Sequence, residues 1–175
     1  MASVLIAYST TDGHTRRIAQ RLAEVIEGRG GEVTVASIDE KPEIDLGPFD
    51  KVVLGASVRY GKHDRQVYRF VERHQKALES RRNAFFSVNV VARKPEKRTP
   101  ETNPYVKKFL GEIDWQPREV AIFAGKIDYP RYRFWDRQMI RLIMWMTKGP
   151  TDPRSVTEFT DWEQVDSFGE RIARM

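Results

Sequence analysis

The sequence predicts an α/β fold of the doubly wound class, in which helices cover both faces of a five-stranded parallel sheet. Short apolar runs such as Val4–Tyr8 and Val52–Ala56 are almost continuous, which is typical of parallel strands buried on both faces. Between these runs lie longer segments whose apolar residues recur every three or four positions, as in helices packed on a sheet. The 175 residues can bury a substantial core, so we predict a single domain over residues 1–175.

The N-terminal half is predicted to hold four strands and two helices. The strand Val4–Tyr8 leads through a hydroxyl-rich loop into a helix whose apolar stripe runs from Thr15 to Ile26. The helix Asp64–Glu79 has His74 on its inward face, where we interpret it as a core residue. The other strands of this half are Glu32–Ser37, Lys51–Ser57 and Asn83–Val91.

The C-terminal half is predicted to supply the helix Tyr105–Ile113, the fifth strand Val120–Gly125 and the final helix Asp161–Arg174. Residues 126–154 follow the fifth strand and exceed what a minimal doubly wound domain needs, so we interpret them as an insertion. A short strand, Ser155–Thr160, is expected to lead from the insertion into the final helix.

The insertion is predicted to contain a basic amphipathic helix, Arg133–Lys148. Its apolar run is shorter than the roughly 20 residues needed to span a bilayer, and the pattern favours a helix lying in a membrane interface or over an apolar ligand. A helix packed on the domain is the alternative. One predicted face carries Trp135, Met139, Leu142, Ile143 and Met146, and another carries Arg133, Arg137, Arg141 and Lys148.

The loop after the first strand has the features of a phosphate site. Unpaired N–H groups at the start of the following helix, the positive helix end and several hydroxyls converge there, and Gly13 allows an anion to approach the backbone closely. A helix cap rich in serine and threonine is the alternative. In parallel sheets, ligands bind beyond the carboxyl ends of the strands, which brings together the loops Thr10–Thr15, Ser57–Gly61 and Ser87–Arg93.

Composition narrows the classes of function. The chain has no cysteine, which excludes disulfides, thiolate zinc sites and cysteine-ligated iron–sulfur clusters, and we expect no metal site. Nothing at the N-terminus marks secretion, so we expect an intracellular protein. The net charge of +5 favours an anionic partner, for which a carboxylate-bearing substrate or a membrane surface is preferred because no nucleic-acid-binding motif is present. Arg93, Lys94, Lys97 and Arg98 concentrate positive charge at the rim of the predicted site.

The stretch Thr10–Thr15 resembles the FMN-phosphate loop of flavodoxins, Thr-x-Thr-Gly-x-Thr. Asp12 departs from that pattern, because a carboxylate beside a phosphate repels it unless the side chain turns away or caps backbone N–H groups. The resemblance implies FMN as cofactor, with the ring held by the other two loops. Tyr60 is then the expected stacking partner of the flavin ring.

Longer stretches are similar to the bacterial menaquinone-dependent protoporphyrinogen IX dehydrogenase family. They are Gly55–Gly61, Ser87–Pro100, Tyr129–Arg133 and Thr160–Val165. The resemblance implies FMN-dependent oxidation of protoporphyrinogen IX to protoporphyrin IX in haem biosynthesis, with six electrons passed in three flavin cycles to menaquinone or ubiquinone. It further implies a cytoplasmic protein, peripheral on the cytoplasmic face of the inner membrane and attracted to anionic lipid. The oligomeric state stays open, a homo-oligomer included.

The expected site residues fall into two groups. The cofactor group comprises Ser9, Thr10, Thr11, Asp12, Gly13, His14, Thr15, Ser57, Val58, Arg59, Tyr60, Gly61, Ser87, Val88, Asn89, Val90, Ala92 and Arg93. The substrate or membrane group comprises Arg93, Lys94, Lys97, Arg98, Arg131, Arg133, Trp135, Arg137 and Arg141.

The catalytic residues are not identified by the sequence. His63 is a weak candidate for proton acceptor, and we favour its interpretation as a solvated loop histidine. Three other functions remain open at this point: a flavodoxin-like electron carrier, an NAD(P)H:quinone reductase and a non-enzymatic membrane-surface module. An acidic docking face would favour the carrier, NADPH oxidation the reductase, and a lack of bound flavin the module.

Overall fold

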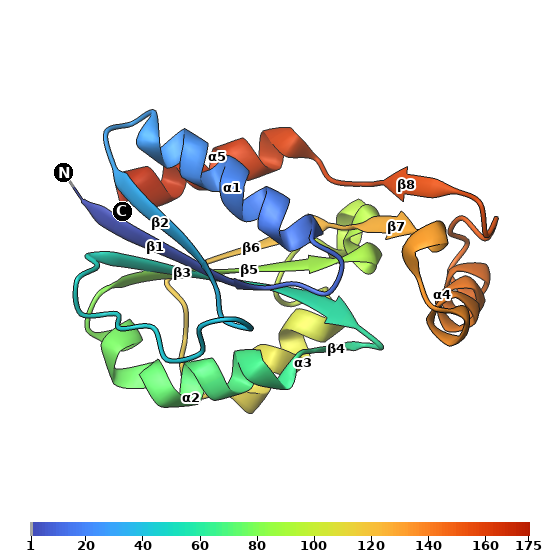
Figure 1. The fold of residues 1–175 in the computed structure, drawn as a ribbon, viewed down its shortest axis with the longest axis horizontal. Coiled ribbons are helices and arrows are strands. Elements are labelled where there is room, and N and C mark those ends of the chain that lie inside the picture. Colours follow the sequence, from blue (N-terminus) through green and yellow to red (C-terminus); the bar gives the residue numbers. More distant parts are fainter. Residues whose placement is uncertain (1) are drawn as a thin grey trace.

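The computed structural model describes residues 2–175 and has the predicted parallel α/β architecture (Figure 1). The strand order of the main sheet is β2-β1-β3-β5-β6, and all of these strands are parallel. Because the chain moves from β1 outward to β2 and then back to β3, the order reverses between β1 and β3, beside the predicted phosphate loop. The strands are β1 (Ser3–Ser9), β2 (Glu32–Ser37), β3 (Lys51–Arg59), β5 (Arg82–Asn89) and β6 (Glu119–Ala124).

Helices cover both faces of the sheet (Figure 1). The helices α1 (His14–Glu27) and α5 (Trp162–Arg174) pack together on one face, and α2 (Arg65–Glu79) and α3 (Pro104–Glu112) cover the other. Successive strand residues point to opposite faces, so Phe85 joins the core under α2 and α3 while Phe86 joins the core under α1 and α5. The sheet is therefore buried on both sides, which explains the apolar strand sequences.

Two strands differ from the prediction at their carboxyl ends. The expected loop Ser57–Gly61 is a hairpin, because β3 continues to Arg59 and pairs with the short strand β4 (Lys62–His63). Tyr60 and Gly61 form its turn with φ angles of 54° and 76°, the positive values that a tight hairpin requires. The fourth predicted strand ends at Asn89, because the Asn89 side chain accepts a bond from the backbone N–H of Ala92 and starts the short helix η1 (Val90–Arg93).

The chain after β6 builds a projection beyond the carboxyl ends of the sheet strands (Figure 1). Strand β7 (Lys126–Asp128) pairs antiparallel with β8 (Val156–Glu158), and η3 (Tyr129–Arg131) leads into α4 (Phe134–Met146). Helix α4 is thus shorter at both ends than the predicted Arg133–Lys148. No helix within residues 2–175 is long and apolar enough to cross a membrane.

The apolar residues of α4 divide between two faces, which corrects the single face expected from the sequence. Ile143 packs inward with Met144 against Ile127 and Tyr129. This cluster anchors the helix to β7 and η3. An outer face stays exposed and includes two tryptophans, Trp135 at 77% and Trp145 at 74% exposure. The outer face consists of Phe134, Trp135, Met139, Leu142, Trp145 and Met146.

Candidate active site

The three predicted loops meet around one pocket at the carboxyl ends of the strands. With its open mouth included, the pocket encloses about 820 Å³. The phosphate loop, the β3–β4 hairpin and the segment after β5 form three sides, and the chain after β6 forms the fourth. The predicted residues that line the pocket are Thr10, Thr11, Asp12, His14, Thr15, Ser57, Val58, Arg59, Tyr60, Gly61, Val88, Asn89 and Val90.

The loop at the start of α1 fits a phosphate group. Gly13 precedes the helix with a φ of 87°, and its N–H donates to Thr10 Oγ1 at 2.9 Å. The hydroxyl of Thr15 is buried and has no hydrogen-bond partner among the described residues. A buried hydroxyl without a partner is costly, so an acceptor oxygen brought by a ligand would stabilise it. The unpaired N–H groups at the start of α1 add further donors.

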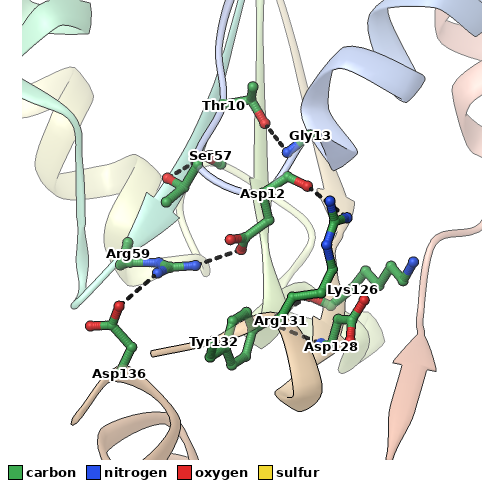
Figure 2. A network of polar contacts seen from close by, with 11 residues as sticks. Thr10, Asp12, Gly13, Ser57, Arg59, Lys126, Asp128, Arg131, Tyr132 and Asp136 are labelled. Atoms are coloured by element: carbon green, nitrogen blue, oxygen red, sulfur yellow. Dashed lines mark hydrogen bonds and ion pairs between the residues drawn. The ribbon is translucent and has the colours of Figure 1, made fainter. Parts of the chain in front are cut away.

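Asp12 does not leave its charge in the pocket unbalanced. Figure 2 shows its carboxylate paired with Arg59, with Asp12 Oδ2 2.5 Å from Arg59 Nη2. Arg131 Nη1 approaches the main-chain oxygen of Asp12 at 3.5 Å. The departure from the flavodoxin loop pattern is therefore compensated within the chain by a guanidinium from the neighbouring hairpin.

A buried amide network supports the third loop. The Asn89 side chain bonds to Asn103, whose Nδ2 donates to Asn89 Oδ1 at 2.9 Å, and Asn103 also caps α3. Asn89 Nδ2 donates to Ser87 Oγ at 3.2 Å. These hydrogen bonds fix the position of the loop, and Val90 of this loop lines the pocket. Tyr60 is 48% exposed at the rim of the pocket, and its stacking on a flavin ring stays a prediction.

Some predicted cofactor residues lie outside the pocket lining, and their roles stay predictions. The Ser9 hydroxyl donates to Asp39 at 3.0 Å, and Arg93 donates to the main-chain oxygen of Thr147 at 2.8 Å. Sequence reasoning placed these side chains at the site because of their position in a loop, whereas their partners come from distant segments. The residues outside the lining are Ser9, Gly13, Ser87, Ala92 and Arg93.

The chain after β6 supplies a wall whose residues were not among the predicted site residues, although the sequence favoured a helix here that lies over an apolar ligand or in a membrane interface. Ile140, Ile143 and Met144 of α4 line the pocket together with Tyr132 and Lys126. The spacing of 140, 143 and 144 is that of one helical face, so a second apolar face of α4 was detectable. Tyr105, Val91, Gly125 and Ile127 complete the residues that were missed.

His63 is buried, so its interpretation as a solvated loop histidine is wrong. The side chain is 2% exposed, its Nε2 lies 2.8 Å from Ser87 Oγ, and its ring packs on Phe109. Burial lowers the pKa of His63 to about 4. The imidazole lies outside the pocket lining and is neutral at physiological pH. His14 also sits in a buried setting, where desolvation lowers its pKa and Nε2 lies 2.6 Å from Thr160 Oγ1.

The cationic segment, residues 93–98, contains two arginines that form hydrogen bonds within the protein and two lysines that do not among the described residues. Arg93 and Arg98 donate to main-chain oxygens, Arg98 Nε to Ala92 at 2.7 Å. Within residues 2–175, the ammonium groups of Lys94 and Lys97 have no hydrogen-bond or ion-pair partner. The residues near α4 that were predicted to contact substrate or membrane lie outside the pocket lining; they are Arg131, Arg133, Trp135, Arg137 and Arg141.

Comparison with known proteins decides the family. Residues 5–154 match the model of the flavodoxin domain family. The chain is 48% identical over 171 residues to the protoporphyrinogen IX dehydrogenase (quinone) of Escherichia coli strain K12, covering 98% of this chain and 94% of that protein. The chain belongs to the protoporphyrinogen IX dehydrogenase (quinone) family. The Leishmania major protein of the same name is 40% identical, over 98% of this chain and 74% of its own length.

Solved structures show the fold that this protoporphyrinogen IX dehydrogenase family member shares with flavodoxins. Oxidised flavodoxin 1 from Bacillus cereus aligns over 99% of this chain and 98% of its own, with a TM-score of 0.56 and 16% identity. A flavodoxin from the domain Archaea aligns over 98% and 96% of the two chains, with a TM-score of 0.56 and 14% identity. The flavodoxin domain implies that the chain binds a flavin.

Proposed function

We propose that this chain oxidises protoporphyrinogen IX to protoporphyrin IX, with FMN as cofactor and a membrane quinone as electron acceptor. The observation that carries the proposal is the extent of the match to the Escherichia coli relative. Because it covers 98% of the chain, it includes most of residues 126–154, which a minimal flavodoxin does not need. In the complete reaction, the macrocycle loses six electrons and six protons while three quinones become three quinols.

FMN would supply the two-electron acceptor at the centre of this pocket. We assign its phosphate to the hydroxyls and N–H groups of Thr10–Thr15 and its ring to the β3–β4 hairpin and the segment after β5. The unpaired Thr15 hydroxyl and the compensation of Asp12 by Arg59 support this assignment.

The apolar wall formed by α4 fits the flexible, apolar macrocycle of the substrate, and the free lysines of the cationic segment fit its two propionates. Replacing Lys94 and Lys97 together with alanine should raise KM for protoporphyrinogen IX about tenfold, since each charged contact of these half-buried side chains is worth roughly 0.5–1 kcal/mol. Steady-state kinetics measure this, and FMN affinity should not change. Lys41 and Lys76, on surfaces away from the pocket, provide a matched double replacement that should leave KM unchanged.

The outer face of α4 suits insertion into a lipid surface. Exposed tryptophans and methionines lie there, and Arg133, exposed at the start of α4, can approach anionic headgroups. Arg141 is less available, because its Nε donates to the main-chain oxygen of Thr151 at 2.8 Å. We therefore place the protein at the cytoplasmic face of the inner membrane, bound peripherally. There the flavin pocket would be close to a quinone dissolved in the bilayer.

Replacing Trp135 and Trp145 together with serine should weaken binding to vesicles of anionic lipid by about 100-fold or more, because each buried aromatic side chain contributes roughly 1.5–3 kcal/mol. Vesicle co-sedimentation measures the loss. Turnover with a water-soluble quinone should persist, because neither tryptophan lines the pocket. Unchanged vesicle binding would contradict the assignment of this face to the membrane.

The proposed reaction is tested under anaerobic conditions. FMN-loaded protein is mixed with protoporphyrinogen IX, the absorbance of oxidised flavin is followed, and a menaquinone analogue is then added. Loss of absorbance followed by recovery, together with porphyrin fluorescence, supports both half-reactions. Reduction by NADPH without any reduction by protoporphyrinogen IX would contradict the proposal and favour a quinone reductase.

A further inference from the structure

Helix α4 stands beyond the sheet (Figure 1). Its inner face nevertheless forms one wall of the flavin pocket. The small cluster around Ile127, Tyr129 and Met144 anchors it to its own β7–η3 segment, which itself projects from the sheet, and Val90 of η1 adds one contact from the main domain. The angle at which α4 meets the pocket therefore depends on contacts with the core of the protein. Two arginines from the core make such contacts, one near each end of the helix.

At the N-terminal end of α4, Arg59 connects the phosphate loop to the helix. Its Nη2 lies 2.5 Å from Asp12 Oδ2, and its Nη1 lies 3.5 Å from Asp136 Oδ2 in the first turn of α4 (Figure 2). The guanidinium also lies over the Tyr132 ring, 5.2 Å from its centroid. The Arg59 and Asp136 side chains are about four-fifths and three-quarters buried, so water screens the pair less than a surface pair.

At the C-terminal end, Arg93 reaches α4 from the segment after β5. Its Nη2 donates to the main-chain oxygen of Thr147 at 2.8 Å and to Thr147 Oγ1 at 2.9 Å. Its Nη1 donates to the main-chain oxygen of Val90, which lines the pocket. A cation at this helix end also interacts favourably with the helix dipole. Burial lowers the pKa of Arg93, and a guanidinium remains charged under these conditions.

We propose that Arg59 and Arg93 are positioning residues that clamp α4 across the flavin pocket, each from a loop assigned to the flavin ring. The two arginines do not need to touch the substrate. They set the distance between the apolar wall of α4 and the ring loops, and hence the width of the slot into which a flexible, apolar macrocycle enters. Because Arg59 pairs with both Asp12 and Asp136, it links the position of α4 to that of the loop Thr10–Thr15. The proposal rests on the proposed function for the identity of the macrocycle and not for the clamp itself.

The experiment measures the exposure of α4 separately from activity. In FMN-loaded protein, trypsin should cleave within residues 131–154 about threefold to fivefold faster for Asp136→Asn, which removes one partly buried ion pair. Arg93→Ala removes the three hydrogen bonds that the Arg93 guanidinium donates, and its cleavage rate should rise tenfold or more. Asp136→Glu keeps the carboxylate and should restore the wild-type cleavage rate.

Kinetics then separate positioning from chemistry. Both variants should raise KM for protoporphyrinogen IX severalfold while kcat stays close to that of the wild type. The FMN affinity of Asp136→Asn should not change, since Asp136 lies outside the pocket lining. The control is Arg21→Ala, which removes a pair at 2.7 Å with Asp166 between α1 and α5, away from α4. It should leave cleavage of residues 131–154 and KM unchanged.

Wild-type cleavage rates and KM in Asp136→Asn and Arg93→Ala would overturn the clamp. Faster cleavage in these variants and not in Arg21→Ala supports it, even if the wild-type protein fails to oxidise protoporphyrinogen IX, in which case only the proposed function fails. Loss of kcat with an unchanged KM would also overturn the clamp, because it would place the arginines in the chemical step.

Discussion

Replacing Gly55 with alanine should lower the free energy of unfolding by about 3 kcal/mol, near the upper end of the usual cost of overpacking a core. A Cβ at this position in β3 would lie 2.1 Å from Cζ of Phe86 and within 2.6 Å of two further ring atoms. Phe86 cannot move aside easily, since it is fully buried against Phe123 and Phe168. Urea unfolding followed by circular dichroism measures the loss.

Gly111→Ala provides the matched control. Gly111 lies in α3, and an added Cβ would meet no atom within 4 Å. Alanine there should stabilise the protein by up to about 1 kcal/mol through its higher helix propensity. Similar unfolding curves for the two variants would mean that the Phe86 ring relaxes at no cost, contrary to the expectation.

Acidification from pH 7 to pH 4 should remove roughly 3 kcal/mol of stability through His63 alone. Its pKa is about 4 in the folded protein and near 6.5 in the unfolded chain, and each unit is worth about 1.4 kcal/mol. Between these values the unfolded chain binds more protons, so stability is complete above pH 6.5 and falls as the pH drops toward 4. Urea unfolding at several pH values measures the slope.

His63→Gln removes the titrating group while its amide oxygen can still accept a bond from Ser87. The variant should show a flatter stability profile between pH 6.5 and pH 4. Loss of a general base lowers turnover by about 100-fold or more. The variant's turnover should fall much less than that, because His63 lies outside the pocket lining. A profile as steep as that of the wild type would assign the acid sensitivity to other groups.

The main elements of the fold were predictable because their causes are local. Burial on both faces makes the strands continuously apolar, and packing on a sheet gives α1 and α5 their apolar stripes. The place of the site followed from the rule that parallel strands bring their carboxyl ends to one edge. The carboxyl ends of β3 and β5 differ from the prediction, since the hairpin turn and the Asn89 cap each involve pairings that apolar patterning does not encode.

The sequence by itself determined the parallel sheet, the loop between the first strand and α1, and the basic, apolar character of residues 126–154, because periodicity and composition report burial along one segment. Only the tertiary structure decided that His63 is buried against Phe109, that Ile143 faces inward, and that Arg59 joins Asp12 to Asp136. A helical pattern shows that α4 has apolar side chains on more than one side, but which side faces the pocket depends on the surfaces that other segments present. Asp12 and Asp136 reach Arg59 from 47 and 77 residues away, and only folding brings groups so distant in the chain into contact.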